Sequence, residues 1–315
     1  YTTLGGFLAA STTDFIQSII MSVALIVVLI FGVETAGGIG AVIHNASELP
    51  GYLSMTLSYD VNTGKAAPYS ALTIVSTAAW GLGYFGMPHI LLRFMAIEDE
   101  KKLKLSRRVA TIWVVISLFV AVFIGVIGYT MSKVGALEML TGSNSETIIV
   151  KISALLSQHG VIFALLAGVI LAGILASTMS TSDSQLLAAS SAVSSDILGA
   201  FRKDSSNKNG SMAAARITLL VISVVAAFIA RNPDSSVFAI VSFAWAGFGA
   251  AFGPVVLFSL FWKRTNKWGA LAGMVCGGSM VFIWKYLIRP LGGIWNIYEL
   301  LPAFLIACAA IVIVS

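Results

Sequence analysis

The chain has 315 residues, of which only 10% are charged and 58% are hydrophobic, and its mean hydropathy is +0.93. Soluble domains carry about 25% charged residues, so these figures exclude a disordered chain, a coiled coil and an ordinary cytosolic enzyme. They indicate a polytopic membrane protein. The net charge of +5 comes from basic residues in short loops between apolar runs, a signal of membrane topology and not of a nucleic-acid partner. Cys276 and Cys308 lie inside apolar runs and indicate neither a disulfide framework nor a metal site.

Eight apolar segments follow one another along the chain, each of about 17 residues or more, which is enough to cross a bilayer as a helix. Strands of a membrane β-barrel would be shorter and would alternate apolar with polar residues. We therefore predict an all-α, polytopic membrane helix bundle, and we expect the sequence to be part of a longer protein. The predicted segments are 4–33, 70–97, 107–132, 159–187, 214–230, 237–262, 268–287 and 298–315.

The distribution of Lys and Arg predicts the orientation of these segments. The loops after the second, fourth and sixth segments hold twelve of the nineteen basic residues, and the opposite side holds six. An excess of basic residues marks the cytoplasmic side of a membrane protein. The first segment is then expected to run outward, with residues 34–69 as an outer loop. Residues 201–213, including Arg202 and Lys203, are expected to form a polar cytoplasmic linker.

The second apolar segment contains three glycines and a proline between Trp80 and His89. Such a helix is expected to kink or unwind, and a broken helix is the usual sequence sign of a transporter binding site. Trp80 and Tyr84 are four residues apart, so they share a face wherever the helix persists. They can offer an apolar wall with a polar edge to a small ligand. The alternative is a kink that serves packing only.

The fourth segment carries Ser177, Ser180, Thr181 and Ser184, which follow helical spacing and form one polar stripe. Hydroxyl and carbonyl oxygens on one face can supply part of the shell of a dehydrated sodium ion. The alternative is close helix packing through small residues.

Of the fourteen acidic residues, only Asp14 and Asp183 are expected to be buried within the spans. A carboxylate inside a membrane is costly, so it is a functional candidate by default. The alternatives are a structural hydrogen bond for Asp14 and a position near the cytoplasmic interface for Asp183.

The sequence resembles the sodium:solute symporter family over nearly its whole length. The resemblance is carried by four stretches: 5–14, 79–97, 179–198 and 243–262. It implies the leucine-transporter-type inverted-repeat fold, here present in part. The first segment would be the last helix of repeat one, the next five would be repeat two, and the last two would be accessory helices. Residues 1–315 would then be a single transmembrane transporter domain, truncated at both ends.

The resemblance also implies roles for individual residues. Trp80, Tyr84 and Pro88 match substrate-recognising positions. Ser180 and Thr181 match sodium-ligating hydroxyls, and Ser177 stands where a backbone carbonyl contributes. Asp14 matches an acid important for sodium coupling, and with Ser180, Asp183 and Ser184 it can form a second sodium site. Met87 replaces a glutamine that is usual in the proline-type branch.

The implied function is sodium-coupled symport of L-proline into the cell across the plasma membrane, with sodium as the cofactor and the lipid bilayer as surroundings. One alternative is a sodium symporter for another small solute. Another is a transporter-like solute sensor fused to a signalling module. An intramembrane enzyme is not expected, because the sequence has neither a nucleophile–base pair nor metal-ligand spacing.

Overall fold

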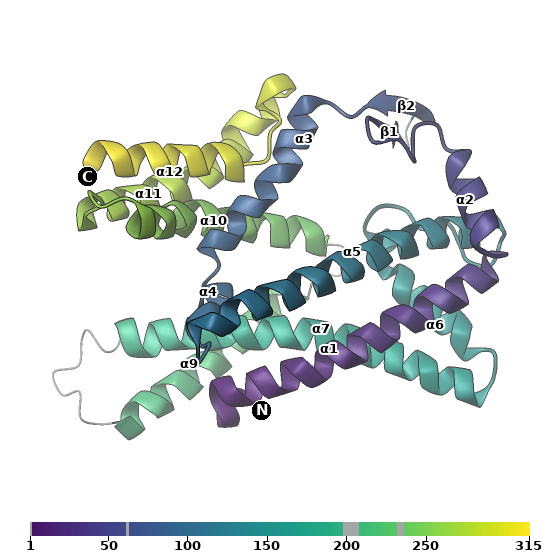
Figure 1. The fold of residues 1–315 in the computed structure, drawn as a ribbon, viewed down its shortest axis with the longest axis horizontal. Helices are drawn as coiled ribbons and strands as arrows, with labels where there is room; N and C mark the ends of the chain where they lie inside the picture. The colour runs from purple at the N-terminus through teal and green to yellow at the C-terminus, as the bar shows by residue number, and fades with distance from the viewer. Residues whose placement is uncertain (1, 61–62, 198–207, 232–235) are drawn as a thin grey trace. The chain divides into compact units, whose positions relative to one another are not determined.

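A computed structural model describes residues 2–60, 63–197, 208–231 and 236–315 (Figure 1). These residues are helical apart from connections and one antiparallel hairpin, in which β1 (Leu57–Asp60) pairs with β2 (Lys65–Pro68). The prediction of an all-α membrane protein is confirmed. The specific inverted-repeat arrangement stays a prediction, as does the single transporter domain over residues 1–315.

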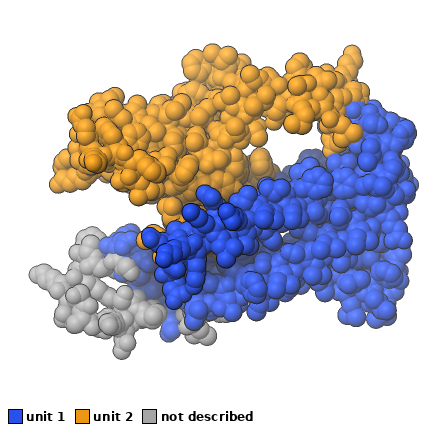
Figure 2. All heavy atoms as spheres, in the orientation of Figure 1, with its two compact units in different colours: residues 1–49, 97–234 blue, residues 50–96, 235–315 orange. Residues whose placement is uncertain are grey.

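The chain divides into two compact units (Figure 2). Unit 1 comprises residues 1–49 and 97–234, and unit 2 comprises residues 50–96 and 235–315. Each unit has its own cluster of buried apolar side chains. The cluster of unit 1 includes Val28, Ile127, Met131, Ile152 and Ile170. The cluster of unit 2 includes Ala246, Ala250, Leu300, Ala303 and Phe304.

Unit 1 is built on three long helices, α1, α5 and α7, of which α1 packs against both of the others (Figure 1). Helix α1 is broken at Gly6, where φ is 59° and only glycine fits without strain. The elements of unit 1 are α1 (Thr2–Thr35), α2 (Ile39–Ser47), the 3₁₀ helix η2 (Glu100–Lys102), α5 (Leu103–Lys133), the 3₁₀ helix η3 (Gly142–Thr147), α6 (Ile148–Ser157), α7 (Val161–Ser191), the π-helix η4 (Ala192–Ile197) and α9 (Lys208–Ile229).

Helices α1 and α7 run in opposite directions. A Cβ atom added at Gly173 of α7 would lie 2.8 Å from the Cβ of Ala24. His159, just before α7 and fourteen residues before Gly173, has its ring 5.4 Å from that of Phe31, which comes seven residues after Ala24 in α1. Residue numbers therefore rise along α1 where they fall along α7. This register decides which residues of the two helices lie at the same level.

Unit 2 is built on α10, which packs against η1, α11 and α12. Helices α11 and α12 approach closely, because a Cβ added at Gly273 would lie 2.5 Å from Ile311. Besides β1 and β2, the elements of unit 2 are α3 (Ala71–Ala78), the 3₁₀ helix η1 (Ala79–Gly86), α4 (Pro88–Met95), α10 (Val237–Phe261), α11 (Lys267–Ile283), the π-helix η5 (Trp284–Ile288), the 3₁₀ helices η6 (Arg289–Leu291) and η7 (Gly293–Trp295), and α12 (Leu300–Val314).

The expectation that all eight apolar segments are full-length spanning helices is only partly met. Among the described residues, five helices are long and apolar enough to cross a membrane, and 213–229 and 300–314 are shorter apolar helices. The remaining segment, 70–97, is interrupted by η1 and is not one continuous helix. In the predicted cytoplasmic linker, residues 198–207, with Arg202 and Lys203, lie outside the described residues.

The expectation that only Asp14 and Asp183 are buried acids is wrong. Both are half-buried, whereas the side chain of Glu299, at the start of α12, is only 1% exposed. Two basic side chains make this burial possible. The carboxylate accepts a hydrogen bond from Arg289 Nη1 at 2.8 Å and lies 3.8 Å from Lys285 Nζ. A buried charge persists where it is paired and hydrogen-bonded in this way.

Candidate substrate and sodium sites

The break in the predicted second segment is present and begins directly after α3. Helix α3 ends at Ala78, the tighter 3₁₀ helix η1 follows, and Met87 is extended with φ −86° and ψ 109°. Helix α4 then begins at Pro88. Proline fits the first position of a helix because its missing N–H has no partner to lose there. The run of glycines before it weakens the helix, so the chain changes conformation between Ala79 and Met87.

Two glycines of η1 allow α10 to approach the broken helix. A Cβ added at Gly83 would lie 1.9 Å from Nε1 of Trp245, and one added at Gly86 would lie 2.3 Å from the backbone oxygen of Phe248. Any side chain at these positions would collide with α10. The glycines therefore both weaken the helix at the break and allow η1 to pack closely against α10.

Trp80 and Tyr84 meet through Trp245 of α10. The rings of Trp80 and Trp245 are nearly parallel, with centroids 5.4 Å apart. The rings of Tyr84 and Trp245 meet edge to face, with centroids 4.8 Å apart. Trp245 Nε1 also donates a hydrogen bond to the Trp80 carbonyl oxygen at 2.9 Å. Tyr84 is 50% exposed and Pro88 is exposed at the start of α4. This aromatic arrangement gives unit 2 an apolar wall.

Sequence reasoning assigned no role to Trp245. The sequence does mark Trp245 as unusual, because it is a tryptophan in a helix otherwise rich in glycine, alanine and phenylalanine. Phe238 and Tyr298 also stack on Trp80, with centroids 5.7 and 5.9 Å away. Trp80 is thus in contact with three aromatic side chains from two other parts of unit 2.

The predicted hydroxyl stripe lies on one continuous helix, α7. The Thr181 hydroxyl donates to the Ser177 carbonyl oxygen at 3.4 Å, and the Ser184 hydroxyl donates to the Ser180 carbonyl oxygen at 3.0 Å. Because each hydroxyl gives its proton to the backbone, its lone pairs remain able to accept a cation. Hard cations prefer such oxygen ligands. The structure brings Ser177 and Thr181 together in this way.

Most of this stripe lies on the face of α7 that packs against α1, and Thr181 is exposed at its edge. Gly173 meets α1 around Met21 and Ala24, and Ser177 and Ser180 lie four and seven residues further along α7, on the same face. Ser184 extends this face by one more turn. Polar oxygens of α7 therefore continue along this face from the close contact at Gly173.

Helical spacing places Asp14 on the face of α1 that turns toward α7. It precedes Met21 by seven residues and so shares the face that Met21 turns to Gly173. Since the helices are antiparallel, moving back along α1 to Asp14 corresponds to moving forward along α7 to about Thr181, at 1.5 Å per residue on each helix. Asp14 is half-buried, as are Ser180 and Ser184. We therefore expect a carboxylate and several hydroxyls to share one level of unit 1.

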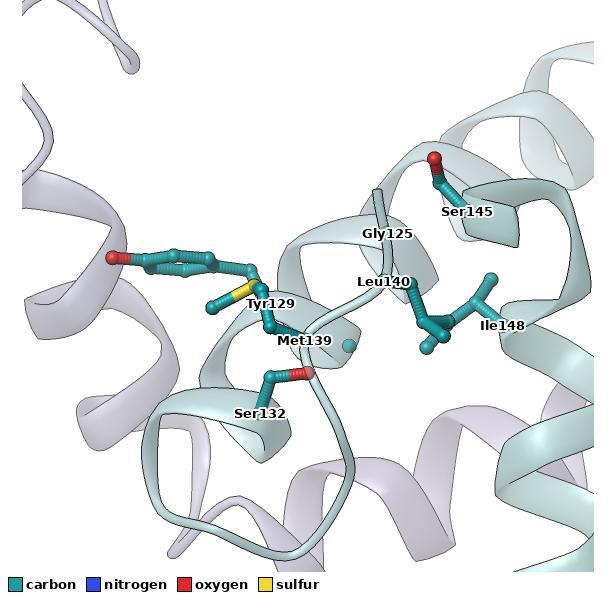
Figure 3. A pocket seen from close by; sticks show the side chains of 8 residues that line it. Gly125, Tyr129, Ser132, Met139, Leu140, Ser145 and Ile148 are labelled. Carbon is teal, nitrogen blue, oxygen red and sulfur yellow. The ribbon is translucent and has the colours of Figure 1, made fainter. Parts of the chain in front are cut away.

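A separate pocket of about 170 Å³ lies elsewhere in unit 1, between the end of α5, the following loop, η3 and the start of α6 (Figure 3). It contains none of the predicted site residues and no charged side chain. Its lining consists of Gly125, Gly128, Tyr129, Ser132, Met139, Leu140, Ser145 and Ile148. The predicted substrate positions belong to unit 2 and the predicted sodium positions to unit 1.

Comparison with known proteins places this chain in a family of transporters. Residues 1–277 match the family model described as the sodium:solute symporter family. Over its whole length the chain is 38% identical to the osmoregulated proline transporter of Bacillus subtilis and 38% identical to the sodium/proline symporter of Salmonella typhimurium. It is 39% identical to the sodium/proline symporter of Haemophilus influenzae. The chain spans 60%, 59% and 61% of the length of these three relatives.

Proposed function

Because the chain belongs to the sodium:solute symporter family, we propose that the full-length protein moves L-proline into the cell together with sodium. The observation that carries this proposal is the similarity of the entire chain to proteins named as proline transporters and sodium/proline symporters. The protein is a multi-pass protein of the plasma membrane. The proposed activity moves a solute and requires no covalent chemistry.

The broken helix of unit 2 supports the substrate part of the proposal. Trp80 and Tyr84 contact Trp245, and the half-exposed Tyr84 offers both an aromatic face and a hydroxyl. L-proline is a compact zwitterion with an apolar ring. Aromatic walls bind such a ring, and backbone groups freed at a helix break bind the charged ends. Pro88 fixes the end of the break.

The polar face of α7 supports the sodium part. We assign the Ser177 carbonyl and the Ser180 and Thr181 hydroxyls to sodium, and Asp14 and Ser184 to sodium coupling or a second sodium. Sodium binds first and stabilises the outward-open state, and proline then binds with higher affinity. This coupling is reciprocal. The membrane potential contributes about 2.3 kcal/mol per charge per 100 mV to inward movement.

Uptake by the full-length protein in proteoliposomes tests the proposal. We expect proline uptake that needs an inward sodium gradient, and weaker uptake of a panel of other small solutes. Replacing sodium with potassium on both sides provides the control for passive leakage. Proline uptake that ignores sodium would exclude the mechanism, and preferred uptake of another panel member would correct the substrate.

Asp14→Asn is expected to raise the sodium concentration for half-maximal uptake about fivefold, because a half-buried charge near a cation contributes ~1 kcal/mol. Asparagine has nearly the same shape but lacks the negative charge. Sodium titration of initial uptake rates measures the effect. Asp99→Asn is the matched control, since Asp99 caps η2 through a hydrogen bond from the Lys101 N–H that asparagine can also accept. Equal behaviour of the two variants would remove Asp14 from the sodium path.

A further inference from the structure

Tyr298, in the connection between α11 and α12, joins three other segments of unit 2. Its backbone N–H donates to Ser76 Oγ in α3 at 2.7 Å, and its hydroxyl donates to the Ser242 carbonyl oxygen in α10 at 2.6 Å. Its ring is nearly parallel to that of Trp80 in η1, at 16° and with centroids 5.9 Å apart. Tyr298 is only 9% exposed. One residue, through its backbone and its side chain, therefore links the helix before the break, the break itself and α10.

The hydroxyl of Tyr298 is well suited to a lasting hydrogen bond. Burial raises the pKa of this phenol well above its ordinary value, so the group stays protonated and keeps donating to Ser242. A tyrosine held at its ring, its hydroxyl and its backbone has little freedom to reorient. The position of its ring then restricts the position of the Trp80 ring beside it.

An ionic network around the buried Glu299 carboxylate fixes the backbone next to Tyr298. The Glu299 carboxylate pairs with Arg289 and Lys285, and Arg289 Nε donates a further hydrogen bond to Asn296 Oδ1 at 3.1 Å. Removing one partner from a buried ion pair is costly because the remaining charge is left uncompensated. The network therefore holds the connection from η5 to α12 in one conformation.

The same network reaches α10. Lys285 Nζ lies 4.0 Å from the ring centroid of Phe243, the residue after Ser242. A cation above an aromatic face is attracted by the negative charge density of the ring. The Lys285–Phe243 contact thus ties the connection to the same part of α10 that accepts the Tyr298 hydrogen bond, independently of that bond.

We propose that Tyr298 is a positioning residue of the substrate site, which holds Trp80 in its binding orientation, and that the Lys285–Glu299–Arg289 network keeps Tyr298 in place. This inference rests on the proposed function, because Trp80 is there assigned to substrate binding. It extends the substrate site to the connection between α11 and α12, for which the sequence predicted no role in substrate recognition. Tyr298 acts through Trp80 and does not itself need to touch the substrate.

Tyr298→Leu and Tyr298→Phe in the full-length protein test this role. The leucine variant loses the ring stacking and the hydrogen bond, and we expect its KM for proline to rise about fivefold, with the maximal rate and the sodium dependence nearly unchanged. The phenylalanine variant keeps the ring and should recover most of the affinity. Tyr286→Leu is the matched control, because Tyr286 lies in the same connection, contacts Phe243 and is 60% exposed.

Hydrogen–deuterium exchange of residues 79–86 in the purified protein separates this inference from the proposed function. We expect faster exchange of this segment in Tyr298→Leu and not in Tyr286→Leu. Unchanged exchange, or an unchanged KM in a well-folded Tyr298→Leu protein, would overturn the positioning role. Wild-type protein that takes up neither proline nor any panel solute would overturn the proposed function, while the exchange result would still decide whether Tyr298 positions η1.

Discussion

Thr181→Ala is expected to raise the sodium concentration for half-maximal proline uptake by about tenfold or more. The Thr181 hydroxyl donates its proton to the Ser177 carbonyl oxygen, so its lone pairs are free to face a cation. Losing one polar contact to a charged group costs about 1.5–3 kcal/mol, and 1.4 kcal/mol corresponds to a factor of ten in affinity. Initial uptake rates measured over a range of sodium concentrations, at saturating proline, give the shift.

Ser182→Ala is the matched control for this experiment. The Ser182 hydroxyl donates to the Thr178 carbonyl oxygen at 2.8 Å, so its removal deletes the same kind of bond from the same helix. At 100° per residue, however, Ser182 points about 150° away from the centre of the hydroxyl stripe. The sodium concentration for half-maximal uptake by the Ser182→Ala variant should stay close to that of the wild type. A similar shift in both variants would mean that the hydroxyls stabilise α7 and do not bind sodium.

The helix break could be predicted from sequence because its causes are local. Three glycines and Pro88 lie within one short stretch, and each acts on its own backbone. The partner of the break could not be predicted in this way. Trp245 binds the Trp80 carbonyl from 165 residues further along the chain, and no periodicity or spacing connects residues so far apart. The contact depends on how α10 packs against η1.

The hydroxyl residues and the acidic residues of the spans also differ in how far local sequence predicts their surroundings. The hydroxyl stripe of α7 follows from helical spacing alone, but the approach of Asp14 depends on the antiparallel register set by Gly173. Glu299 shows the limit of counting charges. Lys285 and Arg289 are among the six basic residues counted on the side opposite the cytoplasm as a topology signal, yet both pair with this carboxylate. A charge count cannot show which charges pair with one another in space.

Gly86→Ala is expected to abolish most proline uptake and to lower the free energy of unfolding by about 1–3 kcal/mol, the usual cost of inserting an atom into a packed core. The new Cβ would lie 2.3 Å from the Phe248 carbonyl oxygen and 2.8 Å from the Gly249 Cα. Both are backbone atoms, so no side-chain rotation can relieve the clash, and η1 must move away from α10. That movement separates Trp80 and Tyr84 from Trp245. Uptake in proteoliposomes and denaturant unfolding in detergent micelles measure the two effects.

Gly81→Ala supplies the control within the same 3₁₀ helix. A Cβ added at Gly81 has nothing within 4 Å, and alanine favours helical backbone over glycine by up to about 1 kcal/mol. This variant should therefore transport proline at nearly the wild-type rate and be no less stable. If Gly86→Ala behaved like Gly81→Ala, close packing of η1 on α10 would not be required for transport. If both lost uptake while remaining folded, the glycines would instead be needed for movement of the broken helix, because alanine restricts the backbone at either position.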